Sequence, residues 1–310
     1  AEAGIFGEPG VATTSLLLDD LTNEPEAIRL ETRFTKDLPD RRVSLRAGDS
    51  LTGGGTLGQP VRFGGVQYAT NFATDPTFVT FPLPTIGGLA DQQSVVEVFI
   101  DNLQRLARET PPGPFAIDNV PVVTGAGEVQ LKVTDLLGRE RIVTQPYYVS
   151  SRLLKEGLHD FSYEAGLERR DYGEKSFGYG DPLLAGTHRY GLTDRLTLEA
   201  HGELQPERQS LVAGGTLLLG RWGTLSGGGG ASLDADAGGG LLGQLAYEYL
   251  GRGFNIGVRS RWTSEDFRQL GLDDGRIERV DQASLGLDLG SAGRLGLFLA
   301  NEARYEEEDR

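Results

Sequence analysis

Long segments in which apolar and polar residues alternate are the feature that most constrains the fold of this chain. Residues 28–35, 161–168, 196–204 and 285–289 follow this pattern. Successive side chains of a β-strand point to opposite faces of the sheet, so each segment has one apolar and one polar face. Helical periodicity is nearly absent, and its one candidate, residues 151–156, is too short to predict a helix. The sequence therefore predicts an all-β protein.

The length of these segments separates two all-β architectures. They run for about 9–12 residues, whereas globular strands usually have 5–6 and tilted membrane strands need about 9–11. Glycine accounts for 45 of the 310 residues, about twice its usual share near 7%. Both observations favour a partial transmembrane antiparallel β-barrel over the alternative, a soluble β-sandwich with one wet face. We count about a dozen segments, roughly four before residue 75 and the others after residue 157.

The middle of the chain has a different sequence pattern. Its strands are shorter and punctuated by proline, and residues 95–100 and 129–134 are the clearest of them. Several consecutive apolar residues in 95–100 predict burial on both faces, as in a sandwich core. A small β-sandwich is therefore expected to interrupt the larger sheet. The predicted organisation is N-terminal barrel strands in 1–78, an inserted β-sandwich in 79–148 and further barrel strands in 149–310.

Two motifs that suggest chemistry have simpler interpretations. Gly48-Asp49-Ser50-Leu51 spells the nucleophile block of a serine esterase family, but no Asp-x-x-His supplies the base. We expect a strand that ends in a turn, with Asp49 and Ser50 as turn-forming residues. The glycine clusters at 227–230 and 238–240 lack the Gly-Lys-Ser/Thr of a phosphate loop. They are predicted to be loop or bulge positions.

Composition excludes several classes of function. The formal net charge of −15 argues against a nucleic-acid partner, because phosphate backbones require a basic face. Without cysteine, disulfides, zinc–thiolate sites and thiol catalysis are impossible. The three histidines are scattered, and no pair of carboxylates stands out for acid–base chemistry. We predict no catalytic site, no metal site and no cofactor.

The alternation also predicts which residues face lipid and which face the lumen of a barrel. An arginine on the lipid face at mid-bilayer costs about 2–4 kcal/mol, so the apolar set should face outward. The predicted outward set is Leu30, Phe34, Tyr163, Leu196, Leu198, Leu285 and Leu287. The predicted lumen-facing set is Arg29, Glu31, Arg33, Arg46, Glu164, Glu199 and Glu203.

An ordered series of sequence blocks from Arg46 to Glu168 resembles the outer-membrane ushers of chaperone–usher pili. RAGDSLT at 46–52 opens the series, and VVEVFIDN at 95–102 follows further on. The strongest single block is PPGPFAIDNV at 111–120, whose turn consists of Pro111, Pro112, Gly113, Pro114 and Phe115. GAGEVQLKVTDLLGRE and QPYYVSSRLLKEGLHDFSYEAGLER complete it. No block is decisive alone, and their order makes the resemblance specific.

The resemblance implies a pore in the outer membrane of a Gram-negative bacterium, with a plug at about 79–148. Such a pore is not an enzyme. It receives pilus subunits from periplasmic chaperone–subunit complexes, assembles and secretes them, and is gated by the plug. The implied partners are those complexes, the pilin subunits and outer-membrane lipid. Charged residues of both the plug and the lumen are expected to hold the closed state, and those of the plug are Arg105, Arg108, Lys132 and Arg139.

Two other classes remain open at this point. A porin-like or solute-transport barrel would normally carry its plug before the first strand or as a folded-in loop. A soluble β adhesin or carbohydrate-binding module would need no lipid. About a dozen strands would not enclose a plug, since barrels of 16–18 strands are the ones that form open channels. The chain is therefore expected to be a fragment whose barrel continues after Arg310.

Overall fold

The chain is almost entirely β-structure. The computed structural model describes residues 1–19, 26–100, 103–272 and 277–305. Helical turns in that part are short 3-10 segments, such as Pro39–Arg41 and Gly220–Trp222. None of its helices is long and apolar enough to cross a membrane. The all-β prediction is confirmed.

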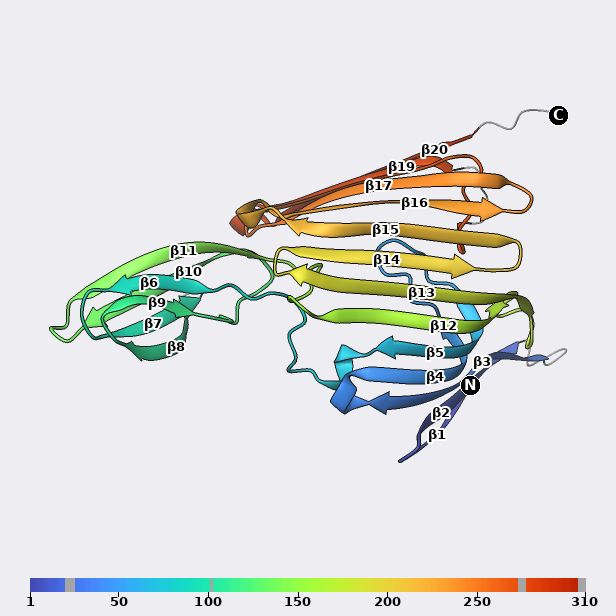
Figure 1. The fold of residues 1–310 in the computed structure, drawn as a ribbon, viewed down its shortest axis with the longest axis horizontal. Coiled ribbons are helices and arrows are strands. Elements are labelled where there is room, and N and C mark those ends of the chain that lie inside the picture. Colours follow the sequence, from blue (N-terminus) through green and yellow to red (C-terminus); the bar gives the residue numbers. More distant parts are fainter. Residues whose placement is uncertain (20–25, 101–102, 273–276, 306–310) are drawn as a thin grey trace.

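Fourteen strands form one large sheet in which every neighbouring pair is antiparallel (Figure 1). The sheet runs in chain order except that its fifth and sixth strands are separated by an inserted domain. Its strands are β1 (Glu2–Gly7), β2 (Gly10–Asp19), β3 (Glu26–Leu38), β4 (Val43–Leu51), β5 (Arg62–Thr70), β12 (His159–Arg169), β13 (Tyr179–Thr193), β14 (Leu196–Leu204), β15 (Arg208–Leu218), β16 (Thr224–Asp234), β17 (Gly238–Leu250), β18 (Phe254–Thr263), β19 (Ile277–Asp288) and β20 (Arg294–Arg304).

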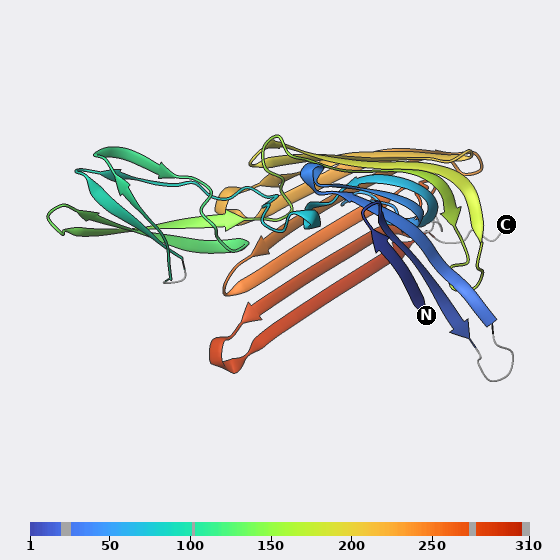
Figure 2. The same ribbon diagram turned by 90° about the horizontal axis from the view of Figure 1, so that it is seen from below.

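The large sheet is a curved wall that is not closed. Figure 2 shows it as an arch, with β1 and β20 at its two free edges. Each of these two edge strands has one partner among the described residues, β2 and β19 respectively. The predicted partial barrel is therefore confirmed as an open wall.

The two faces of the wall have opposite polarity. Along β14, the side chains of Thr197 and Glu199 are buried, whereas Leu198 between them is 43% exposed. Phe34 and Tyr163 are likewise exposed, as expected for the outward set. A water-soluble sheet would bury its leucines, so exposed apolar and buried polar residues indicate a wall that faces lipid outside.

Two loops fold against the concave face and cover its polar residues. Residues 52–61 connect β4 to β5, and residues 264–272 follow β18. Leu57 of the first loop packs with Phe267 of the second and with Val212 of the wall. Both loops thus become part of a small core inside the arch.

The glycine clusters make room for these loops, and their prediction as loop or bulge positions was wrong. Residues 227–230 lie in the middle of β16, and residues 238–240 begin β17. A Cβ on Gly228 would lie 2.9 Å from the side chain of Leu57. One on Gly240 would lie 2.2 Å from the backbone of Phe267. Glycine is therefore required where the inward loops approach the wall.

The prediction of a turn at Asp49 and Ser50 was also wrong. Both residues lie within β4, which extends to Leu51. Gly48 has φ +106°, a conformation that favours glycine. The glycine thus accommodates a local irregularity while the strand continues through Asp49 and Ser50.

The inserted domain is a small sandwich of two sheets. One sheet has the order β11-β10-β7-β8, and the other pairs β6 with β9. Val96, Val98 and Leu131 are fully buried in the core between them. The strands are β6 (Ile86–Ala90), β7 (Ser94–Ile100), β8 (Leu103–Thr110), β9 (Gly113–Ile117), β10 (Gly125–Asp135) and β11 (Glu140–Val149).

The inserted domain lies beyond one end of the wall. Figures 1 and 2 both show β6–β11 extending away from the strand ends rather than under the arch. The strands on either side of the insertion, β5 and β12, are hydrogen-bonded neighbours. The domain is therefore tethered through two linkers that leave the same place in the wall.

Candidate functional site: the polar concave face and the plug contacts

Glu199 and Glu164 anchor the first inward loop. The Glu199 carboxylate accepts hydrogen bonds from the backbone N–H of Thr56 at 2.6 Å and of Leu57 at 3.2 Å, and from the Thr56 hydroxyl at 2.7 Å. Glu164 accepts one from the Gly53 N–H at 2.9 Å. Carboxylates on β12 and β14 thus satisfy loop donors that have no strand partner.

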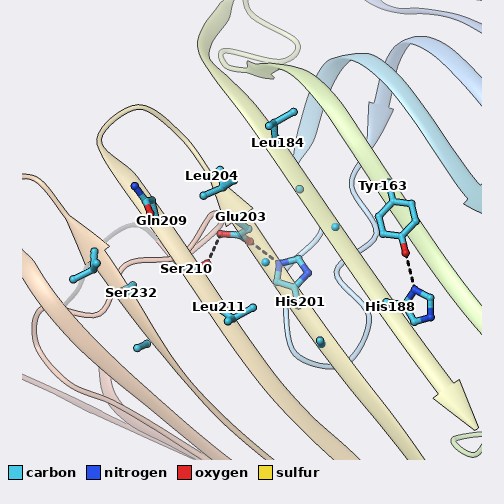
Figure 3. Close-up of a pocket in the computed structure, with 16 residues that line it drawn as sticks. Tyr163, Leu184, His188, His201, Glu203, Leu204, Gln209, Ser210, Leu211 and Ser232 are labelled. Carbon is cyan, nitrogen blue, oxygen red and sulfur yellow. Dashed lines mark hydrogen bonds and ion pairs between the residues drawn. The ribbon is translucent and has the colours of Figure 1, made fainter.

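Glu203 anchors the second inward loop, and His201 is hydrogen-bonded to Glu203. The side chains of His201 and Glu203 are 1% and 3% exposed, and His201 Nε2 lies 2.8 Å from Glu203 Oε1. The other Glu203 oxygen accepts hydrogen bonds from the Leu270 N–H at 2.9 Å and the Ser210 hydroxyl at 3.1 Å. Figure 3 shows Glu203 between His201 and Ser210. Thr187 completes the group through a 2.8 Å contact with His201 Nδ1.

Four of the seven residues predicted to face the lumen lie on this concave face. Glu164, Glu199 and Glu203 hold the loops as described, and Arg46 donates a 2.7 Å hydrogen bond to the Gln67 side chain. Gln67 in turn donates to Glu164 at 2.8 Å. The sequence did not reveal that these groups are covered by loops, because the loop residues carry no distinguishing pattern.

Arg29, Glu31 and Arg33 do not follow one simple alternation. Glu31 lies opposite Ser15, but Arg29 lies opposite Leu16, so the register shifts at Leu30. An extra residue in one strand reverses the facing of the residues beyond it. Regular pleating therefore does not place Arg29 and Glu31 on the same face of the sheet, contrary to the prediction from the sequence.

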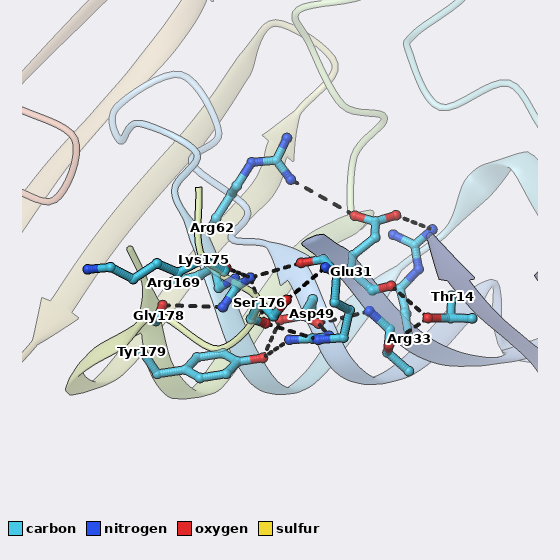
Figure 4. Close-up of polar contacts among 12 residues, drawn as sticks. Thr14, Glu31, Arg33, Asp49, Arg62, Arg169, Lys175, Ser176, Gly178 and Tyr179 are labelled. Atoms are coloured by element: carbon cyan, nitrogen blue, oxygen red, sulfur yellow. Dashed lines mark hydrogen bonds and ion pairs between the residues drawn. The ribbon is translucent and has the colours of Figure 1, made fainter. Parts of the chain in front are cut away.

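Arg29 instead joins the wall to the loop between β12 and β13. Figure 4 shows its partners Asp49, Ser176 and Tyr179 close together. Arg29 forms an ion pair with Asp49 and donates hydrogen bonds to the Tyr179 hydroxyl at 2.7 Å and the Ser176 carbonyl at 3.1 Å. Arg169 donates to the same Ser176 carbonyl at 3.0 Å. Because Asp49 serves this network, the esterase-like motif has a structural role.

The other two residues of that segment lie near each other. Glu31 is 4.0 Å from Arg33 and 3.9 Å from Arg62. These are long, partly exposed contacts and contribute little to stability.

Glu199 offers a direct test of the loop anchors. In Glu199→Leu, the backbone donors of Thr56 and Leu57 lose their acceptor, at about 1–3 kcal/mol each. We expect faster proteolysis of residues 52–61 and a lower thermal midpoint of the detergent-solubilised protein. Glu207→Leu, at an exposed turn, is the matched control. Equal effects of the two substitutions would contradict the anchoring role.

The inserted domain docks on the end of β17 through one compact set of contacts. The Tyr148 ring stacks on Tyr249 with centroids 5.7 Å apart, and its hydroxyl oxygen accepts a 3.2 Å hydrogen bond from the Leu250 N–H. Arg152 and Glu248 form an ion pair at 2.7 Å. Burial raises the pKa of the Tyr148 phenol above its usual value. These five residues are called the docking contact below.

A second set of contacts holds the linker that leaves β5. The Arg42 guanidinium lies 3.9 Å from the centre of the Phe78 ring and 2.9 Å from Asp75. Hydrogen bonds from Thr77 and Arg42 hold the pKa of Asp75 below its usual value. The two linkers also meet, since the Lys155 N–H donates to the Thr80 carbonyl at 2.9 Å.

The proline-rich turn lies within the inserted domain, and Pro111, Pro112 and Pro114 are exposed. Pro111 and Pro112 separate β8 from β9, and Gly113 and Pro114 begin β9. Phe115 packs beside the domain core. This turn is not part of the docking contact.

The plug charges expected to hold a closed state differ in their environment. Lys132 binds Glu140 at 2.6 Å, and this hydrogen bond raises the pKa of Lys132. Arg139 binds Asp135 at 2.7 Å within the same hairpin. Arg105 and Arg108 are exposed on β8. In this arrangement, none of the pairs described for Lys132 and Arg139 reaches the wall.

A metal centre finds no support in the described part of the chain. No group of three or more His, Asp or Glu side chains there could hold an ion. The histidines pair with each other, with Tyr163 or with Glu203.

Comparison with known proteins identifies the family. The sequence profile described as "Outer membrane usher protein" matches residues 21–233. The chain belongs to the outer membrane usher family. The resemblance found in the sequence blocks is thereby confirmed, together with an outer-membrane location in a Gram-negative bacterium. Ushers form transport and assembly pores, and the family is not one of enzymes.

Individual relatives of this usher chain cover most of it. It is 30% identical over 244 residues to the outer membrane usher protein FaeD of Escherichia coli, which covers 77% of the chain and 29% of that protein. It is 26% identical over 196 residues to FasD of Escherichia coli, covering 63% of the chain and 23% of that protein. The chain thus spans less than a third of the length of these relatives.

Solved structures share the fold. The chain is similar, with a TM-score of 0.70 and 17% identity, to a protein in the Escherichia coli P pilus tip assembly intermediate PapC-PapD-PapK-PapG, covering 99% of this chain and 41% of the other. The PapC translocation pore gives a TM-score of 0.56 at 17% identity, with 97% and 65% covered. At this identity the similarity concerns the fold.

Proposed function

We propose that this usher chain forms part of the wall of an outer-membrane pore that assembles and secretes pilus subunits, with residues 79–148 as its movable plug. The observation that carries the proposal is the insertion of β6–β11 between two hydrogen-bonded strands of the wall. Both linkers leave from one place, so the domain can change position without breaking the pairing of β5 with β12.

Further strands are proposed to close the wall. β1 and β20 carry backbone donors and acceptors with no partner on one side within the described residues. In lipid, each unsatisfied group costs several kcal/mol, which an open wall could not sustain. Residues 1–78 and 149–310 are accordingly assigned to one barrel.

The connections between strands support a periplasmic position of the displaced plug. On the plug side they are short, as at residues 8–9 and 194–195. At the opposite end, residues 170–178 and 264–272 belong to longer connections. Outer-membrane barrels generally have short periplasmic turns and long extracellular loops. A plug displaced to the periplasmic side lies outside the lumen, which is then free for the passage of subunits.

Periplasmic chaperone–subunit complexes and pilin subunits are the proposed partners, and outer-membrane lipid surrounds the wall. The related assembly contains PapD, PapK and PapG together with PapC. Pairing of a donor strand with an incomplete subunit supplies main-chain hydrogen bonds and side-chain burial. We propose that this drives secretion without a catalytic site, a cofactor or nucleic acid.

Deleting residues 79–148 from the full-length protein tests the gating. We expect single-channel conductance in planar bilayers to rise severalfold, because a folded domain can no longer move into the lumen and obstruct it. Assembly of the deletion variant is checked by its heat-dependent mobility on gels. Unchanged conductance of a correctly assembled variant would contradict gating by this domain.

A further inference from the structure

An apolar groove crosses the convex face of the wall over β13, β14, β15 and β16. It has a volume of about 620 Å³. Figure 3 shows Leu184, Leu204 and Leu211 on three neighbouring strands around it. These leucines are 53%, 50% and 64% exposed. The groove therefore lies on the same surface as the apolar residues that contact lipid.

Small residues form the floor of the groove. Gly186 and Gly202 lie directly opposite each other on adjacent strands, and Ala200 lies opposite His188. The Tyr163 ring leans over Gly186, where a Cβ would meet it at 3.1 Å. The groove is thus a depression whose floor consists of residues with little or no side chain. Larger side chains surround this floor. Four strands are three spacings of about 4.8 Å, so it is roughly 14 Å across.

The two ends of the groove differ in polarity. At one end, the Tyr163 hydroxyl contacts His188 Nδ1 at 2.6 Å, and His188 Nε2 contacts His159 Nδ1 at 2.9 Å. These polar groups satisfy one another on a surface that has no water. At the other end, Gln209 lies beside the turn at 205–207, where the wall meets a polar rim that includes Arg170.

We propose that this groove binds one acyl chain of a membrane lipid, with the headgroup at the 205–207 turn. The groove is continuous with the lipid-facing surface of the wall, and this continuity identifies lipid as its occupant. The leucines around the groove are exposed in the isolated chain, and in the outer membrane lipid covers them. A chain lying over Gly186 and Gly202 contacts backbone and leucine methyls at once, which flat parts of the wall do not offer. The site does not depend on movement of the plug.

Photocrosslinking tests the site in the full-length protein. The probe is phosphatidylethanolamine with a diazirine on its acyl chain, in vesicles of phosphatidylethanolamine and phosphatidylglycerol. We expect peptides that contain residues 184–204 and 211 to be labelled several-fold more than peptides from residues 241–262. Gly202→Leu fills the floor of the groove and should remove most of that excess.

Gly227→Leu is the matched control. Like Gly202, Gly227 has a leucine methyl 3.6 Å from the position of a Cβ, and it is not part of the groove. It should leave the labelling unchanged. Uniform labelling of the convex face in the unsubstituted protein would overturn the proposal, because lipid would then contact the whole face without preference for the groove. Equal loss in the two variants would overturn it as well. Uniform labelling can be recognised in the unsubstituted protein alone, even if a variant fails to assemble.

Discussion

Leu245→Arg is expected to prevent most assembly of the usher wall in the outer membrane. Leu245 lies near the middle of β17 and is 49% exposed on the convex face. An arginine facing lipid at this depth costs about 2–4 kcal/mol. The ratio of assembled to unfolded protein should therefore fall roughly 30- to 800-fold. Heat-dependent gel mobility and the yield of protein in the outer-membrane fraction measure the effect.

Leu233→Arg is the matched control for depth. Leu233 is 65% exposed on the same face but lies at the end of β16. Near the membrane interface the cost of an arginine falls to about 0–1 kcal/mol. Normal assembly of both variants would show that the convex face does not contact lipid.

Tyr148→Ala is expected to release the plug from the end of β17. The substitution removes the stacking on Tyr249 and the acceptor for the Leu250 N–H. An aromatic pair contributes about 0.5–1.5 kcal/mol and a hydrogen bond a similar amount. The displaced position should therefore lose roughly 5- to 150-fold in relative population. If the plug then enters the lumen, bilayer recordings of the full-length usher will show fewer conducting events.

Three further variants test whether the docking contact determines the position of the plug. Tyr148→Phe keeps the ring and loses only the hydroxyl, so its effect should be smaller. Ile142→Ala, exposed at 64% on the same strand β11, should have none. Because the chain contains no cysteine, Tyr148→Cys with Tyr249→Cys, whose rings stack in the docking contact, can be joined by a thiol-specific linker, which should hold the pore open. Equal recordings from Tyr148→Ala and Ile142→Ala would rule out the docking contact as a determinant of plug position.

The alternating pattern was sufficient to predict the type of fold and the polarity of both faces. Pleating places alternate residues on opposite sides whatever the rest of the molecule does, so Leu198 and Glu199 could be assigned from the sequence. The same argument failed at Leu30, where one extra residue shifts the register and separates Arg29 from Glu31. Bulges depend on how two strands pair, and the pairing is not visible in either strand alone.

The sequence by itself determined that this chain builds a lipid-facing β-wall with a proline-punctuated domain inserted in it. Only the tertiary structure decided what covers the polar face and where that domain sits. Gly228 lies in the middle of a strand, where the absence of a side chain leaves space for Leu57 of the inward loop. The docking contact joins Tyr148 to Leu250, about a hundred positions apart, through a backbone N–H that every residue except proline carries. Contacts of this kind leave no signature in local sequence, since they depend on the shape of the assembled surface.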